Sequence, residues 1–214
     1  MHSCCLGVTL NYNGLSIWAL VENGYVNVKG ATKPETRKLR LKRINESLRN
    51  YYRSQPSSIT RISRITFKML GPPMSQNPRF KAAESRHLLP YVVQELAAQT
   101  PAVNPNFLRA GQRLLELHCL LAENGQYVSP GVEARAMVLL AEHVWFFTAA
   151  GGKTVFKHHF LSHGLERMGR CGNLMYTWVY GDEAYNGKMK LIARTARNPL
   201  TFPRIVLEKC LRNL

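Results

Sequence analysis

Two proline-containing breaks divide the middle of this 214-residue chain into stretches that favour helix. The three stretches span residues 81–99, 106–123 and 131–148. Thr100-Pro101 with Asn104-Pro105 forms the first break, and Ser129-Pro130 ends the second, because proline and the residue before it resist helical conformation. In the middle stretch one helix face carries the large apolar residues Phe107, Leu114, Leu117 and Leu121. The pattern predicts a helical bundle within residues 81–150.

The N-terminal part predicts two further helices. Residues 6–21 are rich in apolar side chains without a clean period and end at the turn signal Glu22-Asn23-Gly24. Thr32 and Glu35 have the spacing of a capping box, with Pro34 early enough to be tolerated, so a helix follows and ends by residues 54–56. Its apolar positions at helical spacing are Leu41, Ile44, Leu48 and Tyr51. The other positions are crowded with Arg37, Lys38, Arg40, Lys42 and Arg43.

The remaining segments complete a prediction of mainly α structure with a small β component. Residues 57–70 alternate loosely, and residues 71–78 are a loop by composition. Residues 156–168 favour helix, residues 175–180 a short strand, and residues 182–194 and 203–211 helices. We therefore expect three regions, at residues 1–80, 81–150 and 151–214.

The charge of the chain points to a polyanionic partner. Lys and Arg number 29 against 13 acidic residues, which gives a net charge of +16, and Asp182 is the single aspartate. Nucleic acid is the common partner of such a surface, and a ribosomal-type or merely very soluble surface is the alternative. No apolar run approaches the ~18 residues that a membrane span needs, and no secretory signal begins the chain. The sequence makes no prediction of oligomeric state.

Cysteine spacing indicates reduced thiols. The five cysteines, Cys4, Cys5, Cys119, Cys171 and Cys210, are odd in number, and two of them are adjacent. No disulfide framework is expected.

Two clusters have the composition of metal sites. His159 and His163 lie one helical turn apart, beside His158, and Cys171 is a conceivable third ligand, although packed histidines are the alternative. Asp182 and Glu183 are the only adjacent carboxylates of the chain and lie at a predicted strand end, where they would bind a hard divalent cation. The alternative is a favourable interaction with a helix N-terminus. The basic run 37–43 is either a phosphate-contacting or nuclear-import patch or a solvated helix face.

Several strings, taken together and in order, resemble the CACTA (En/Spm-like) and related DNA transposases. Met1-His2 with Leu6-Gly7-Val8 resembles their Asp-x-Met-His...Leu-Gly segment, and residues 81–90 resemble the start of their helical insertion. Residues 157–163, Gly172-Asn173 and residues 180–183 are similar to their closing His-rich and Glu-containing segment. The resemblance touches most of the chain, through short motifs.

The resemblance implies a helical insertion region with the remnant of a ribonuclease-H-like α/β core. In that family two aspartates and a glutamate bind two divalent metals for DNA strand transfer. Glu183 matches the third carboxylate, with Asp182 as its substitute, and Mg²⁺ or Mn²⁺ would be the cofactor of any remaining activity. Lys157, His158 and His163 match basic and imidazole positions that would orient DNA or the core. Lys157 and His158 belong to the predicted nucleic-acid-binding set, which also includes Lys188, Lys190 and Arg194 in the helix at residues 182–194.

The departures from the family pattern decide the expected activity. The second aspartate precedes Met-His in the family and would lie upstream of Met1 here, and the first would lie further upstream. We therefore expect a C-terminal transposase fragment, nuclear in a eukaryote, that binds DNA in preference to RNA and does not cut it alone. The alternatives are a non-enzymatic basic RNA-binding or ribonucleoprotein component and a histidine-metal hydrolase.

Overall fold

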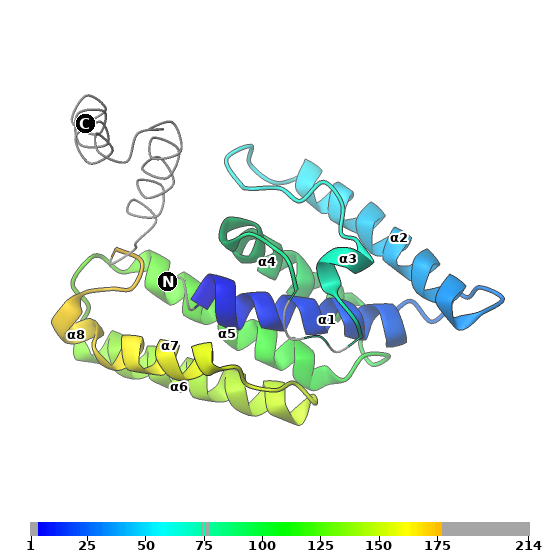
Figure 1. The fold of residues 1–214 in the computed structure, drawn as a ribbon. Coiled ribbons are helices and arrows are strands. Elements are labelled where there is room, and N and C mark those ends of the chain that lie inside the picture. The colour runs from blue at the N-terminus through cyan, green and yellow to red at the C-terminus, as the bar shows by residue number, and fades with distance from the viewer. Residues whose placement is uncertain (1–3, 74, 76–77, 177–214) are drawn as a thin grey trace, which may run out of the picture. The chain divides into compact units, whose positions relative to one another are not determined.

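The computed structural model describes residues 4–73, 75 and 78–176, which form a helical fold (Figure 1). The elements are η1 (Cys4–Val8, a π-helix), α1 (Thr9–Asn23), α2 (Lys33–Arg53), α3 (Phe67–Leu70), α4 (Ala82–Ala98), α5 (Pro105–Glu123), α6 (Pro130–Ala149), α7 (Phe156–Glu166) and α8 (Met168–Cys171). The described residues belong to one unit of the chain, Met1–Thr177. None of the helices in this part is long and apolar enough to cross a membrane.

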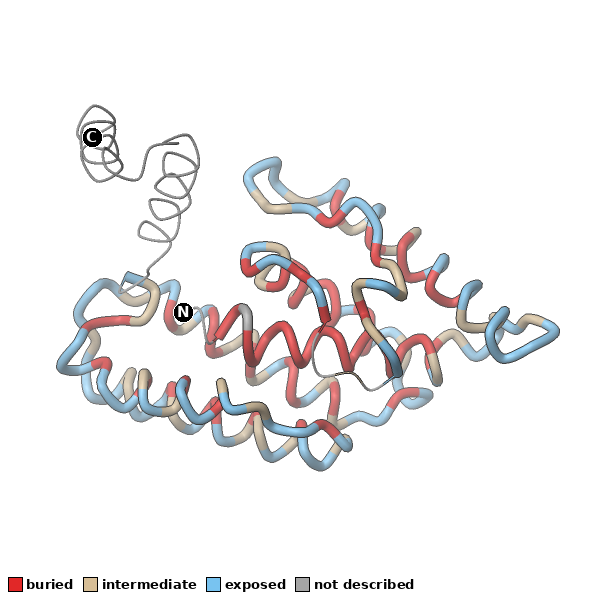
Figure 2. The backbone as a smooth tube through the Cα atoms, in the orientation of Figure 1, coloured by how far each residue is buried: buried red, intermediate tan, exposed pale blue. Residues whose placement is uncertain are grey.

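Helix α1 runs through the centre of the bundle. Every residue from Thr9 to Val21 is buried, as the continuous red run of Figure 2 shows, because η1, α2, α4 and α5 all pack against it. A helix that is enclosed on all sides needs no amphipathic period, which explains the irregular apolar pattern of residues 6–21. Some of its polar side chains bond to neighbouring elements. Tyr12 donates to the Phe107 carbonyl at 2.8 Å and Asn13 Nδ2 to the Ser85 carbonyl at 2.7 Å.

The helices expected in the middle of the chain are confirmed as α4, α5 and α6. The side chain of Asn104 accepts from the Asn106 amide and that of Ser129 from the Val132 amide, so both proline-containing breaks also supply helix caps. Gly111 lets α5 approach α1 closely, since a Cβ at this position would stand 2.0 Å from the Tyr12 hydroxyl. Helix α2 packs on α1 and is hydrogen-bonded to α4.

Helix α2 begins where the capping signal predicts. The Thr32 hydroxyl accepts from the Glu35 amide at 3.3 Å, and the Glu35 carboxylate accepts from the Ala31 amide at 2.8 Å. The buried apolar face contains Leu41, Ile44, Leu48 and Tyr52. Tyr52 therefore takes the core position that helical spacing assigned to Tyr51, which is half-buried.

The predicted β component is not found in the described part of the chain, which contains no strand. Met175 and Tyr176, the first two residues of the expected strand, lie in a turn held by Asn173. The Asn173 side chain is buried and donates to the carbonyls of Leu121 and Asn124. The rest of that strand and the helices expected at residues 182–194 and 203–211 lie outside the described residues.

Contacts cross both of the expected region boundaries. Helix α1 packs on α4 across residue 80, and α6 packs on α7 across residue 150. Helix α7 matches the helix expected at residues 156–168. The fold is thus mainly helical, and a remnant of an α/β core is not seen in the segments that the structure describes.

Candidate nucleic-acid interface

The basic run of α2 is divided by the structure into inward and outward side chains. Arg40 is turned inward and is 9% exposed. Its Nε donates to the Val28 carbonyl at 3.2 Å, and its Nη1 donates to the carbonyls of Val21, at 3.1 Å, and Glu22. These carbonyls belong to the last turn of α1 and the loop after it, where a helix leaves acceptors without intrahelical donors. The guanidinium of Arg40 therefore caps α1, and its contact with nucleic acid stays a prediction.

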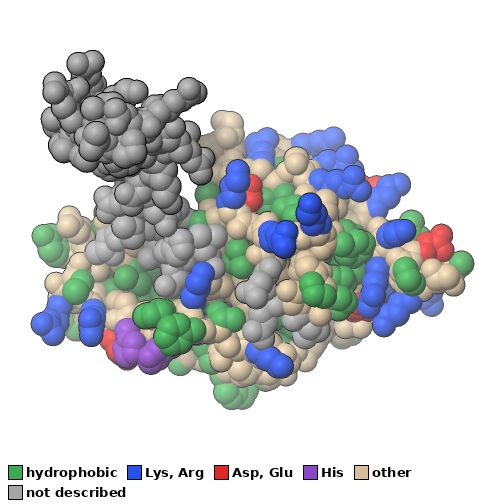
Figure 3. Space-filling model, in the orientation of Figure 1, with side chains coloured by type: hydrophobic (Ala, Val, Ile, Leu, Met, Phe, Trp, Pro, Cys, Tyr) green, Lys and Arg blue, Asp and Glu red, His purple; other side chains and the backbone are tan. Residues whose placement is uncertain are grey.

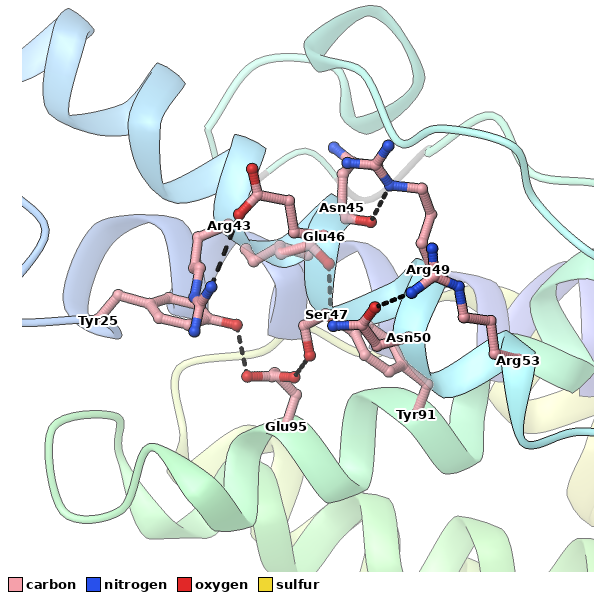
Figure 4. Close-up of polar contacts among 11 residues, drawn as sticks. Tyr25, Arg43, Asn45, Glu46, Ser47, Arg49, Asn50, Arg53, Tyr91 and Glu95 are labelled. Atoms are coloured by element: carbon pink, nitrogen blue, oxygen red, sulfur yellow. Dashed lines mark hydrogen bonds and ion pairs between the residues drawn. The ribbon is translucent and has the colours of Figure 1, made fainter.

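Two other arginines of the run pair with glutamates. Arg37 forms an ion pair with Glu22 and lies over the Trp18 ring, 5.8 Å from its centroid. Arg43 is 3.6 Å from Glu46 on the next helical turn (Figure 4). These contacts neutralise part of the basic face, and they leave Lys38 and Lys42 as its exposed cations without an ion pair among the described residues.

A groove of about 650 Å³ runs between α2 and the segment at residues 63–67. We call it the basic groove, because Lys38, Lys42, Arg49 and Arg64 line it and none of its described lining residues is acidic. Figure 3 shows Lys and Arg side chains gathered over the part of this face where α2 lies. Four cations in one concave surface raise the local positive potential, which attracts a polyanion.

Asn45 fixes the second wall of the basic groove against α2. Its Nδ2 donates to the carbonyls of Leu41 and Ile65, at 2.9 and 3.0 Å, and its Oδ1 accepts from the Ile65 amide at 2.7 Å. Asn45 and Ile65 are both buried. The Asn45 amide thus bonds to both backbone groups of Ile65, as a neighbouring strand would in a sheet. Because these bonds hold the segment at residues 63–67 in place, the groove is formed without a ligand.

Buried contacts also fix α2 to α4 beneath the groove (Figure 4). Glu95 accepts from the Tyr25 hydroxyl and, at 2.5 Å, from Ser47 of α2. Burial, together with the hydrogen bond to Glu95, raises the pKa of Tyr25, so this hydroxyl keeps its proton and donates. Tyr91 donates to the Ile44 carbonyl at 2.8 Å. The basic helix therefore rests on a rigid support that does not involve its exposed cations.

The predicted residues of α7 are used differently from one another. His158 is buried, with its ring 5.9 Å from that of His143, and its Nδ1 accepts from the Val155 amide at 3.1 Å. Burial lowers the pKa of His158, which favours a neutral ring. His158 caps α7 inside the core, and its contact with nucleic acid stays a prediction. Lys157 lies at the contact of α7 with η1, where its Cβ stands 2.5 Å from a Cβ built on Gly7.

His159 and His163 do come together on the exposed side of α7. Their Nε2 atoms are 3.1 Å apart, and His163 Nδ1 lies 3.0 Å from a Glu166 carboxylate oxygen. The described residues contain no group of three or more side chains that could hold a metal ion, so Cys171 does not join this pair. Asp182 and Glu183 lie outside the described residues, as do Lys188, Lys190 and Arg194.

Sequence reasoning missed two residues of the basic groove, Arg49 and Arg64. Arg49 is detectable, because residues 38, 42, 45 and 49 follow helical spacing on one face of α2. Arg64 carries no such signal, since it reaches the groove only through the long-range pairing of Asn45 with Ile65.

A buried thiol cluster was also missed. Cys4 Sγ is 3.5 Å from His118 Nε2, and the Thr9 hydroxyl is 2.9 Å from the same nitrogen. Hydrogen bonding from Cys5 and the nearby His118 lower the pKa of the Cys4 thiol. Cys4 and Cys5 are fully buried, so this cluster packs η1 on the core and offers no surface to a substrate. The four cysteines of the described residues are free thiols, as expected.

Comparisons with protein-family models, with curated proteins and with solved structures find no match to this chain.

Proposed function

We propose that the chain is a nucleic-acid-binding protein that holds a phosphate backbone in the basic groove between α2 and residues 63–67. The observation that carries the proposal is a preformed groove with four basic side chains and no acidic one among its described lining residues. Phosphates would supply the missing counter-charge and release the counterions that otherwise occupy the groove.

The pairing of other cations supports this assignment. On α5 and α6, Arg113 lies 2.7 Å from Glu116 and 3.0 Å from Glu142, and Arg135 also pairs with Glu116. By contrast, Lys38, Lys42 and Arg64 have no ion pair within the described part of the chain. The groove thus gathers four cations without an acidic residue among its described lining, whereas the surface of α5 and α6 is balanced.

We further propose that DNA is preferred over RNA and that the chain does not cut it. The DNA preference and a nuclear location follow from the resemblance to DNA transposases. The lack of cleavage rests on the carboxylates, because the family needs two aspartates and a glutamate, whereas Asp182 is the single aspartate of the sequence. Mg²⁺ or Mn²⁺ would bind at Glu183 and Asp182 if any activity remained. Tighter binding of RNA than of DNA of the same sequence would favour the ribonucleoprotein alternative.

The test is a titration of fluorescent duplex DNA with the full-length protein over a range of salt concentrations. Four phosphate contacts predict a slope of log K against log salt of roughly −3 to −4. The variant Lys42→Gln/Arg64→Gln should make this slope shallower by about 2, because each lost contact removes about 0.9. A flat salt dependence of the unmodified protein would refute nucleic-acid binding.

A matched control separates the groove from net charge. Arg113→Gln/Arg135→Gln removes the same two charges from paired positions of α5 and α6. Its binding should stay close to that of the unmodified protein. If both double variants lose affinity equally, the whole charge of the chain rather than the groove carries the binding. Incubation of supercoiled DNA with Mg²⁺ or Mn²⁺ tests cleavage, and nicking that disappears in Glu183→Ala would overturn the proposed inactivity.

A further inference from the structure

A second, smaller hollow of about 310 Å³ adjoins the basic groove. Its walls are mostly apolar and come from α1, α2, α3 and the loop after α3, with lining residues Trp18, Pro34, Arg37, Lys38, Phe67, Gly71 and Pro73. Lys38 and Phe67 line both the hollow and the basic groove. A ligand in the groove therefore has an apolar hollow beside its phosphates.

Two N–H donors of the residues that line this hollow lack partners. Trp18 is 3% exposed, and its indole Nε1 has no hydrogen-bond partner among the described residues. The Nε of Arg37 is also buried and without an acceptor in this part of the chain. Buried donors without an acceptor are rare in native proteins and call for a ligand or another explanation. Both groups only donate, so a complementary ligand must present acceptors.

The faces of the Trp18 indole are already in use. The Phe67 ring stacks on it with centroids 5.6 Å apart and an interplanar angle of 30°, and the Arg37 guanidinium lies over it. The indole therefore has no free face for stacking, and its N–H is the group that is left without a partner. Phe67, which is half-buried, and the prolines supply the flat apolar contacts.

We infer that this hollow receives one unpaired base of the nucleic acid whose phosphates lie in the basic groove. A nucleobase has flat apolar faces and an edge with carbonyl oxygens and ring nitrogens that accept hydrogen bonds. In a duplex the base faces are stacked and the pairing edges are occupied, so only a single-stranded or locally opened segment presents them. This inference rests on the proposed nucleic-acid binding and adds that the preferred ligand is unpaired.

The test uses the full-length protein and three probes of equal length, about 12 nucleotides. They are a single strand, the duplex of the same sequence and a strand that keeps its phosphates but lacks the bases. The single strand should bind about 10-fold tighter than the abasic strand, the scale of one base contact. Equal affinity for these two strands, or tighter binding of the duplex, would overturn the inference.

The outcomes distinguish the inference from the proposed function. If all three probes bind equally and with a steep salt dependence, the groove binds nucleic acid and the base hollow does not. If none of them binds, the proposed function fails. This comparison needs no variant, so it does not depend on whether an altered hollow folds.

Two variants then locate the base contact. Trp18→Phe removes the indole N–H and keeps an aromatic ring, whereas Phe67→Leu removes the aromatic wall and keeps apolar volume. Each should reduce the preference for the base-bearing strand over the abasic strand from about 10-fold to about 3-fold or less and leave the salt slope unchanged. Phe160→Leu, at an exposed aromatic of α7, is the control and should keep the full preference. A preference that survives both hollow variants in folded protein would place the base contact elsewhere.

Discussion

The variant Asn45→Ala should release the wall of the basic groove at a cost that the hydrogen bonds predict. The substitution removes three hydrogen bonds, to the carbonyls of Leu41 and Ile65 and from the Ile65 amide. Each buried hydrogen bond contributes about 1 kcal/mol net, and a buried amide left without an acceptor costs about 1 to 3 kcal/mol. Because Ile65 is fully buried, we expect the free energy of unfolding to fall by about 3 kcal/mol.

Chemical denaturation followed by circular dichroism measures this loss, and amide hydrogen exchange shows where it occurs. The Ile65 amide should lose protection first, and DNA affinity should fall even in protein that remains folded, because the groove loses its second wall. Asn50→Ala is the control, since Asn50 is an exposed residue of the same helix and accepts from Arg53. A loss in Asn45→Ala as small as in Asn50→Ala, with the Ile65 amide still protected, would refute the assignment of Asn45 as the clamp.

Two further predictions concern buried groups. Arg40→Met should lower the free energy of unfolding by about 3 kcal/mol, because three backbone carbonyls lose their donor. The slope of log K for DNA binding against log salt should equal that of the unmodified protein. A shallower slope would show that Arg40 contacts the nucleic acid. Burial lowers the pKa of His143 from 6.5 to about 4. The unfolded chain therefore binds this proton more tightly, and the free energy of unfolding should fall by roughly 3 kcal/mol between pH 6.5 and pH 4. Chemical denaturation at a series of pH values measures this change. If the free energy of unfolding of His143→Gln falls just as much between pH 6.5 and pH 4, His143 is not the cause of the pH dependence.

The helices were predictable wherever the signal is local. Proline and asparagine or serine at the starts of α5 and α6 act within one helical turn, so the sequence places these boundaries correctly. The capping residues Thr32 and Glu35 do the same for α2. These signals need no knowledge of the neighbouring elements.

Local signals do not show how a side chain or segment is placed where distant parts of the chain determine it. Arg40 has the same local surroundings as Lys38 and Lys42, and only the exposed carbonyls at the end of α1 turn it inward. His158 is buried because its ring faces His143 of α6, and nothing in the run of histidines indicates this. The expected strand begins as a turn because Asn173 is bound to the C-terminal end of α5. Each of these residues serves a neighbour far away in sequence.

The contacts that hold α2 in place do not involve the cations of the groove, so binding and stability can be tested separately. The helix is fixed from below by Tyr91 and by Glu95 with Ser47, and its second wall is fixed by Asn45. None of these contacts uses Lys42 or Arg64, which are exposed. Four like charges in one groove repel one another, so removal of two should leave the free energy of unfolding unchanged or slightly raised. A loss of DNA affinity in Lys42→Gln/Arg64→Gln without a loss of stability would therefore report on binding at the groove rather than on the fold.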